Sequence, residues 1–211
     1  MKATVISAMA RTLAYARGSV PSRDRQGAFF VCLAALALLA AACATVKPLP
    51  VLGAIPQFEL VAQTGGAFDS RTLDRHIWIA NFIYTTCDGP CPMMSRQMRG
   101  IQNSTESSPG VKLVSFTVDP ARDTPEVLAK YARLLKADPA RWYFLTGAAA
   151  ALNDLGLKAF KLNSVDGSLS HSTRFVLVDR ARRIRGFYIA SDDDFPKRLL
   201  HDVNQLQTEK Q

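Results

Sequence analysis

Thr85-Thr86-Cys87-Asp88-Gly89-Pro90-Cys91-Pro92 joins a predicted buried strand to a predicted helix and carries two thiols. The apolar run before it, Trp78 to Tyr84, is typical of a strand that is buried on both faces. Gly89 and Pro90 predict a turn, and Pro92 suits an early helical position, because the N–H that it lacks would have no partner there. We therefore expect both sulfurs at the exposed mouth of a sheet, where thiols serve redox chemistry or bind a soft metal rather than fill a core.

Strand and helix patterns alternate from Phe58 onward. Thr124 as N-cap, Pro125 at the first helical position and Glu126 in the first turn are start signals for one helix. The alternation predicts an α/β fold, a thioredoxin-like sandwich with a central mixed sheet flanked by helices. In such sheets the loop at the carboxyl end of an early strand forms the active edge, and the cysteine segment is such a loop. The predicted strands are residues 58–62, 77–84, 111–118, 142–145, 175–178 and 186–189, and the predicted helices are residues 92–100, 125–136, 148–157 and 195–206.

Cys87 and Cys91 stand four residues apart. If the segment forms a turn that enters a helix, both sulfurs can face one side. The partial positive charge at a helix N-terminus favours thiolate over thiol, and thiolate is the form that both Cu(I) and disulfide exchange require. A structural disulfide is the alternative, but a bridge that closes so small a loop removes little entropy from the unfolded chain and so stabilises little.

The N-terminus has the features of an export signal. Arginines between residues 11 and 25 precede an apolar stretch from Ala28 to Ala42, and small residues run into Cys43. This arrangement resembles a bacterial lipoprotein processing site, and an uncleaved membrane anchor or a buried core helix are the alternatives. Because the arginines stay inside, the domain is expected to be tethered to the membrane and to face the periplasm or the outside of the cytoplasmic membrane. The expected division of the chain is an export signal or membrane anchor, a proline-rich tether and one domain: residues 1–43, 44–56 and 57–207.

Composition limits the partners of the exported part. The chain has a net charge of +8, but residues 1–42 contain five basic residues and one acidic residue, so about half of that charge lies in the signal. The remaining positive charge is small, and its basic residues form no stripe that alternates with aromatic residues. The exported part is therefore not expected to bind nucleic acid. Of the four cysteines, Cys32 lies inside the signal and Cys43 at its end, which leaves Cys87 and Cys91 as the pair in the domain.

Three segments of the chain carry a family resemblance. They are the CxxxCP motif within residues 81–92, the stretch Val118-Asp119-Pro120-Ala121-Arg122-Asp123-Thr124-Pro125, and Ser170-His171-Ser172 directly before the strand pattern at 173–178. In this order they resemble the Sco/SenC family of copper-binding, thioredoxin-like assembly factors for cytochrome c oxidase. The resemblance covers about residues 55–205.

The resemblance implies that Cys87, Cys91 and His171 are the ligands of a copper site. Two thiolates alone satisfy linear Cu(I), and a neutral imidazole would give a three-coordinate site that also accommodates Cu(II). His171 lies 80 residues after Cys91, so it must reach the sulfurs through the fold, from the loop before the 173–178 strand. The family implies a copper metallochaperone that assists assembly of the dinuclear copper centre, with the copper-receiving subunit of cytochrome c oxidase as its partner.

A thiol–disulfide oxidoreductase is the alternative function. Cys87 and Cys91 would then be a catalytic redox pair that acts on cysteines of the oxidase or of other exported proteins, and His171 would not be needed. The thiol pair alone does not separate the two functions, so whether the chain is an enzyme stays open. A redox or copper sensor that signals through a partner is a third hypothesis.

The remaining histidines and two methionines are expected to have no role at the metal. His76 and His201 lack a motif around them and are expected to be solvated. Met93 and Met94 fall in the first turns of a helix that faces the core, where methionine usually packs.

Two aspartates and a run of arginines are also expected to be structural. Asp119 is expected to form a turn with Pro120, and Asp123 is expected to border the capped helix. The arginines between residues 180 and 185 crowd a predicted hairpin tip, which is typical of a solvated loop.

Overall fold

An eight-stranded mixed sheet runs through the part of the chain that the computed structural model describes, residues 47–162 and 173–209. The strand order is β1-β8-β7-β4-β5-β6-β2-β3, in which β4, β5 and β6 are parallel and β7 runs antiparallel to β4. The strands are β1 (Gly53–Ala54), β2 (Glu59–Ala62), β3 (Ala67–Asp69), β4 (Ile77–Ile83), β5 (Val111–Thr117), β6 (Trp142–Thr146), β7 (Arg174–Val178) and β8 (Arg183–Ile189).

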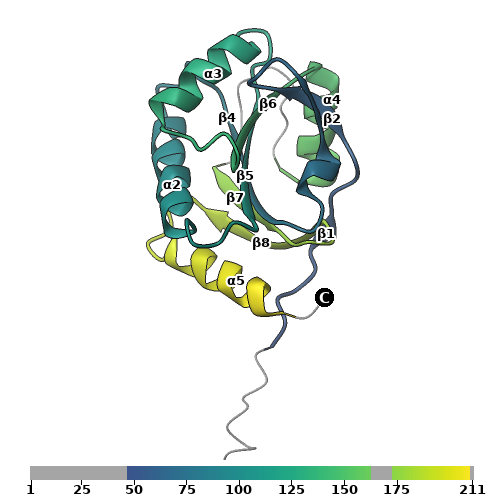
Figure 1. Cartoon of the computed structure of the whole chain (residues 1–211), viewed down its shortest axis with the longest axis vertical. Helices are drawn as coiled ribbons and strands as arrows, with labels where there is room; N and C mark the ends of the chain where they lie inside the picture. The colour runs from purple at the N-terminus through teal and green to yellow at the C-terminus, as the bar shows by residue number, and fades with distance from the viewer. Residues whose placement is uncertain (1–46, 163–172, 210–211) are drawn as a thin grey trace, which may run out of the picture. The chain divides into compact units, whose positions relative to one another are not determined.

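Helices cover both faces of this sheet (Figure 1). One layer holds α2 (Cys91–Ser104), α3 (Pro125–Leu134) and α5 (Lys197–Thr208). The other side is covered by α4 (Ala149–Asp154), the π-helical turn η2 (Leu155–Ala159) and the β2–β3 hairpin, which the short 3-10 helix η1 (Ser70–Leu73) follows. The α/β architecture with a central mixed sheet flanked by helices is confirmed. Across the described ranges, no helix combines the length and the apolar character that crossing a membrane requires.

The two halves of the core lie on opposite faces of β4. Every residue of β4 is buried, as expected for a strand that is covered on both sides. Ile79 and Ile83 pack into the cluster under α2, α3 and α5, whereas Trp78 and Phe82 pack with Phe160 on the other side. The alternation of side chains along a strand therefore connects both layers through one central element.

Local signals fix the start of α3, whereas the predicted end of α2 is wrong. The Thr124 Oγ1 atom accepts a hydrogen bond from the Val127 N–H at 3.4 Å, which confirms the cap. The helix expected to stop near Gly100 runs on to Ser104, because one exposed glycine costs a helix only about 1 kcal/mol while Met98 and Ile101 bury its inner face. The helix expected over residues 148–157 consists of α4 and then η2, which ends at Ala159.

The prediction of a solvated arginine loop is wrong for Arg185. Strand β8 begins at Arg183, so Arg185 lies inside the sheet with only 2% of its side chain exposed. Its guanidinium pairs with Asp179 at 2.8 Å and with Glu209 at 2.8 Å. It also donates hydrogen bonds to the carbonyl oxygens of Leu49, at 2.6 Å, and Pro50, at 3.1 Å. We call these contacts the Arg185 clasp.

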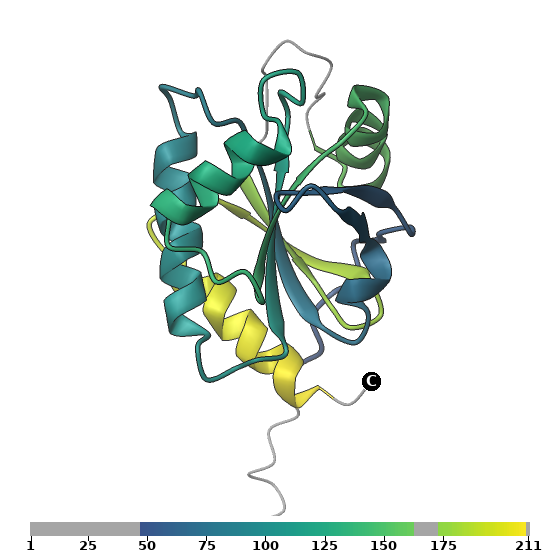
Figure 2. The same cartoon turned by 45° about the horizontal axis from the view of Figure 1, so that its top comes forward.

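The clasp holds the first described residues and the end of α5 against the β7–β8 hairpin. Strand β1 pairs with β8, and the Leu52 N–H donates to the Ile184 carbonyl at 2.8 Å. The part of the expected tether that the structure describes therefore lies along the domain. Figure 2 places this end of the sheet at the bottom and the loops that follow β4 and β5 at the top.

Candidate metal centre

The two cysteines meet at the carboxyl edge of β4. Cys87 lies in the loop after this strand, Cys91 is the first residue of α2, and both are reduced thiols. Cys87 is 6% exposed and Cys91 is 0% exposed, so the expectation that both sulfurs lie at an exposed mouth is wrong. Helical spacing accounts for the burial of Cys91, which shares the buried face of α2 with Met94 and Met98.

Hydrogen bonds converge on the Cys87 sulfur. It accepts from the Gly89 N–H at 3.4 Å, from the backbone N–H and thiol of Cys91, and from the Tyr84 hydroxyl. Burial opposes ionisation of Cys87, but these donors outweigh burial and lower its pKa. The N–H of Cys91 belongs to the N-terminus of α2, so the helix start favours the Cys87 thiolate as expected.

Cys91 behaves in the opposite way. Burial, together with the hydrogen bond that its thiol donates to Cys87, raises the pKa of Cys91 to about 12. The pKa of Tyr84 is raised to about 12 because its hydroxyl donates to Cys87. The pair therefore divides into one sulfur that ionises readily and one that holds its proton.

Asp123 holds the start of the cysteine loop. Its carboxylate is fully buried and accepts hydrogen bonds from the Thr85 hydroxyl at 2.5 Å, the Thr85 N–H at 3.2 Å and the Thr117 hydroxyl at 2.5 Å. Thr85 follows β4 and Thr117 ends β5, so the carboxylate joins the ends of two parallel strands beneath the thiols. The sequence indicated a structural role for Asp123 but not these partners.

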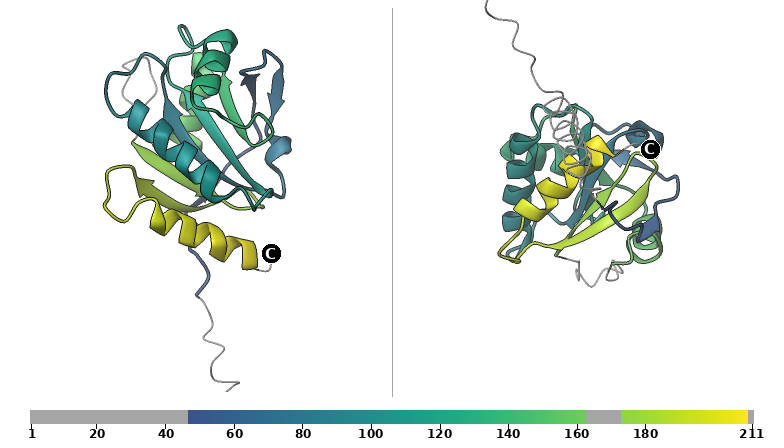
Figure 3. Two further views of the ribbon diagram at one scale, coloured as in Figure 1. Left: turned by 60° about the vertical axis from the view of Figure 1, so that its left-hand side comes forward. Right: turned by 90° about the horizontal axis from the view of Figure 1, so that it is seen from below.

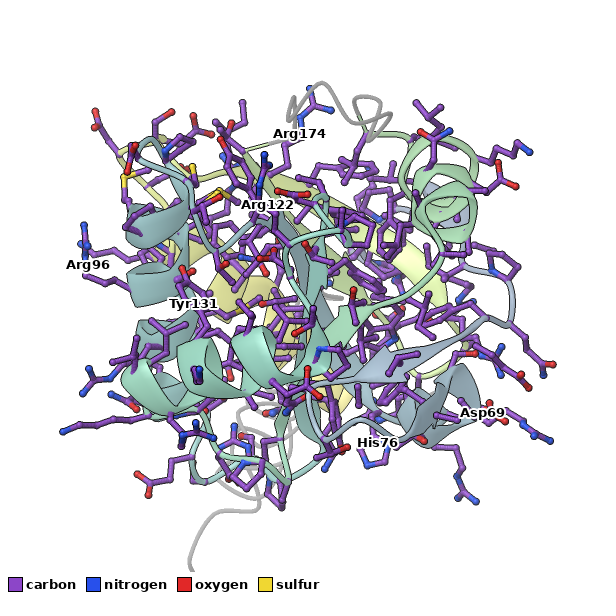
Figure 4. The ribbon with its side chains drawn as sticks, turned by 90° about the horizontal axis from the view of Figure 1, so that it is seen from above. Asp69, His76, Arg96, Arg122, Tyr131 and Arg174 are labelled. Carbon is purple, nitrogen blue, oxygen red and sulfur yellow. The ribbon has the colours of Figure 1, made fainter. Side chains whose placement is uncertain are left out.

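Asp119 forms the expected turn. Its N–H donates to the Thr117 hydroxyl at 2.9 Å, and its carboxylate pairs with Arg122 at 2.8 Å. The Arg122 side chain is 65% exposed, and Figure 4 labels it on the edge that carries the cysteine loop. Asp119 thus shapes the loop after β5.

A tyrosine that sequence reasoning missed joins α2 to α3 near the thiols. The Tyr131 hydroxyl lies 2.9 Å from the Ser95 hydroxyl, one turn after Cys91 (Figure 4). Burial raises the pKa of Tyr131. The contact braces the first turns of α2, and nothing in the spacing of Ser95 and Tyr131 in the sequence reveals it.

The start of β7 lies at the same edge as the end of β4. The strands are antiparallel and pair Ala80 with Val176, so Arg174 lies near the carboxyl end of β4 (Figure 4). His171 comes three residues before Arg174 and lies outside the described residues. Of the other histidines, His201 is exposed on α5, and the His76 Nδ1 atom lies 2.9 Å from the Asp74 carbonyl at the opposite end of β4.

The described residues supply two soft donors. Within residues 47–162 and 173–209, no three His, Cys, Asp or Glu side chains form a group that could hold a metal ion. Met94 is fully buried in the core with Met93 packed against the same cluster, as expected for packing residues.

The SCO1/SenC family model matches residues 52–207, which is most of the chain. The chain belongs to the SCO1/SenC family. Among curated relatives, a candidate copper-binding protein of Stutzerimonas stutzeri is 36% identical over 151 residues, which are 68% of this chain and 72% of that protein.

Solved structures agree with this assignment. A SCO1/SenC family lipoprotein from Bacillus anthracis str. Ames superposes with a TM-score of 0.68 at 26% identity, over 76% of this chain and 98% of that one. BsSco, described as a member of the Sco family of cytochrome c oxidase assembly proteins with a disulfide switch, superposes with a TM-score of 0.67 at 26% identity, over 78% of this chain and 100% of that one. The thioredoxin-like fold is thereby confirmed.

Two kinds of chemistry are open to this SCO1/SenC site. A pair of thiolates binds a soft monovalent ion, and a low-pKa thiolate beside a second thiol exchanges disulfides. Both use Cys87 and Cys91, and they differ in their need for a third ligand.

Proposed function

We propose that this domain binds copper through Cys87, Cys91 and His171 and delivers it to the copper-receiving subunit of cytochrome c oxidase during assembly of the dinuclear copper centre. The observation that carries the proposal is the pair of reduced thiols in hydrogen-bond contact at the carboxyl edge of β4. The names of the Stutzerimonas stutzeri relative and of BsSco support copper binding and oxidase assembly.

The two sulfurs fit a copper ion as cargo. Two thiolates satisfy Cu(I), and metal binding drives thiol deprotonation even where burial opposes it, as at Cys91. The Cys87 thiolate accepts several donors before the metal arrives, so it is the first ligand in this scheme. Cys91 then exchanges its proton for the metal.

The position of His171 in the chain supports its role as the third ligand. It precedes Arg174 by three residues, and three residues of chain span at most about 10 Å. Arg174 begins β7, which pairs with β4 near the edge that carries the cysteine loop. A nitrogen ligand would extend the site from Cu(I) to Cu(II).

Copper loading of the soluble unit tests the proposal. We expect one copper ion per chain for the unit that starts at Pro48, and none above background for the double variant Cys87→Ser/Cys91→Ser. His171→Ala should retain Cu(I) more weakly and lose the Cu(II) spectrum, whereas His201→Ala, a matched change on exposed α5, should behave as wild type. If wild type holds no more copper than the double variant, the metallochaperone function fails.

A second candidate is thiol–disulfide exchange, which the opposite pKa shifts of the two cysteines favour. The Cys87 thiolate would attack a client disulfide and release one client thiolate, and Cys91 would then attack Cys87 to release the second. The client gains two electrons and the pair is oxidised to a disulfide. His171→Ala should leave this activity intact and Cys87→Ser should abolish it, which separates the enzyme from the metallochaperone.

We propose that residues 1–43 export the chain or anchor it in the membrane, and that residues 44–56, which lie along the domain from Leu49 onward, connect this segment to the domain, residues 57–207, outside the cytoplasmic membrane. The description of the Bacillus anthracis relative as a lipoprotein supports a lipid on Cys43. Mass spectrometry of membrane-extracted protein separates the alternatives. A lipidated chain lacks residues 1–42 and carries diacylglycerol mass, whereas an uncleaved anchor retains the full sequence.

A further inference from the structure

The outer surface of the α2–α3 pair carries a cluster of basic residues. The two helices lie in one layer, which Figure 3 (left) brings forward, and they are joined by the hydrogen bond from the Gln102 side chain to the Lys136 carbonyl at 3.2 Å. Figure 4 shows Arg96 pointing outward from α2. The basic residues of α2, of α3 and of the turn after α3, which we call the basic face, are Arg96, Arg99, Lys130, Arg133 and Lys136; Arg99 is half-buried and the other four are exposed.

The charges of the basic face are not compensated by ion pairs. Among the residues that the structure describes there are nine ion pairs, and none involves α2, α3 or Lys136. Helix α2 contains no Asp or Glu. The acidic residue of α3 is Glu126 in its first turn, where its carboxylate accepts a hydrogen bond from the Thr124 hydroxyl and attracts Lys130 without an ion pair. These cations therefore have no ion-pair partner within the described residues, which leaves them able to meet an anionic partner.

An exposed leucine lies among these cations. Leu134 is 80% exposed, the highest exposure recorded for a large apolar side chain in the described part of the chain. Together with Lys130 and Arg133 it lines an open hollow of about 440 Å³. Cations that flank an exposed leucine are characteristic of helices that lie in the headgroup region of a membrane. An acidic protein would also match the charges, so binding to polyglutamate is one of the outcomes of the test below.

We propose that the basic face binds the anionic surface of a phospholipid membrane, with Leu134 entering the boundary between headgroups and acyl chains. The cations attract anionic headgroups and the leucine adds buried apolar area. With this face on the membrane, α2 lies against the bilayer, and the cysteine loop at its start is held close to the membrane surface. This contact goes beyond the proposed copper function and is independent of how the N-terminus is anchored.

Vesicle co-sedimentation tests the proposal with the unit that starts at Pro48, so that no anchor contributes. This unit contains both halves of the core, and the Bacillus anthracis structure corresponds to this part of the chain alone. We expect binding to vesicles of phosphatidylcholine with phosphatidylglycerol, weaker binding at high salt, and none to pure phosphatidylcholine. Each cation removed should weaken binding about fivefold, so Arg96→Gln/Lys130→Gln/Arg133→Gln should lose about a hundredfold.

A variant of equal charge provides the control. Arg71→Gln/Lys158→Gln/Arg198→Gln removes three exposed, ion-paired cations from other surfaces and should bind close to wild type. Leu134→Asn should weaken binding to the anionic vesicles without a change in net charge. Circular dichroism establishes that each variant is folded, and copper loading should be the same in all of them.

Three outcomes would overturn the proposal. Equal losses in the control and the basic-face variant would show that net charge, and not this face, attracts the vesicles. If Leu134→Asn binds anionic vesicles as tightly as wild type, Leu134 does not insert at the boundary between headgroups and acyl chains. Retention of wild type on polyglutamate, lost in the basic-face variant and with no binding to anionic vesicles, would assign the face to an acidic protein instead.

Discussion

The two ends of the sheet use buried charge in different ways. At the Arg185 clasp, a buried guanidinium meets two carboxylates and two carbonyl oxygens, and the pairing holds both ends of the described chain in place. At the cysteine end, the buried carboxylate of Asp123 meets only threonine donors, and the two sulfurs share hydrogen bonds with each other. Buried ion pairing therefore fixes the end of the sheet that carries the clasp, whereas at the cysteine end a buried carboxylate accepts hydrogen bonds from neutral donors and makes no contact that occupies the sulfurs.

Breaking the clasp should have the largest effect on stability. Arg185→Met removes the cation from between Asp179 and Glu209 and leaves the buried Asp179 carboxylate with Arg183 as its remaining ion-pair partner. Loss of one member of a buried pair costs about 3–5 kcal/mol of unfolding free energy. Urea unfolding of the unit that starts at Pro48 measures it.

Arg198→Met is the matched control for that measurement. Arg198 also pairs with two carboxylates, but its side chain is 45% exposed, and such surface pairs contribute about 1 kcal/mol or less. If the two variants lose the same free energy of unfolding, burial does not make the Arg185 ion pairs stronger than the exposed ones of Arg198. In both variants the two thiols should remain reactive, because the clasp lies at the far end of the sheet.

Loosening the cysteine end should cost less stability and change its chemistry. In the wild type, the Thr85 and Thr117 hydroxyls each donate to a different carboxylate oxygen of Asp123, and the Asp123→Asn amide keeps only one oxygen that can accept. A hydrogen bond to a charged group contributes about 1.5–3 kcal/mol. We expect urea unfolding to show a loss in that range and copper affinity to fall, because Thr85 no longer fixes the loop. Thr124→Val is the comparison variant. It removes the N-cap of α3, so it should lower the free energy of unfolding and leave the copper affinity unchanged.

The sequence predicted the features that depend on residues close to one another along the chain. The apolar run predicts β4 and places the cysteines at its carboxyl edge, and Thr124 with Pro125 predicts the start of α3, because these signals act within one turn or strand. The end of α2 near Gly100 was not predicted well, since tertiary packing of the inner face outweighs the local cost.

Features that depend on distant partners could not be predicted. Asp123 contacts Thr85 across 38 residues, and Arg185 contacts Leu49 across 136. In the sequence Arg185 resembles the other arginines of its turn, and only the earlier start of β8 buries it. The burial of the Cys91 sulfur follows from which face of α2 packs on the sheet, and His171 as a ligand stays a prediction.

Alkylation sharpens the contrast within the thiol pair. The folded-state pKa of Cys87 is lowered, so its thiolate forms at a lower pH than that of an ordinary cysteine, whereas Cys91 with a pKa of about 12 stays protonated through the neutral range. In the reduced, metal-free unit, iodoacetamide should modify Cys87 first. The rate of Cys87 alkylation should increase at a lower pH in the folded unit than in an unfolded control. Peptide mass spectrometry assigns the site. Initial modification of Cys91 would contradict the assignment of the nucleophile.

The smallest expected effect is a gain in stability at Gly100. This residue lies in the interior of α2, and a β-carbon added there would meet no atom within 4 Å, so Gly100→Ala should raise the unfolding free energy by about 0.4–1 kcal/mol. The change lies more than two turns from Cys91 and touches neither sulfur, so the alkylation rate of Cys87 should stay the same. A parallel fall in that rate would mean that Cys87 reacts only when α2 as a whole opens. The two ends of the sheet would then share one unfolding event, and the separation of stability from reactivity would not hold.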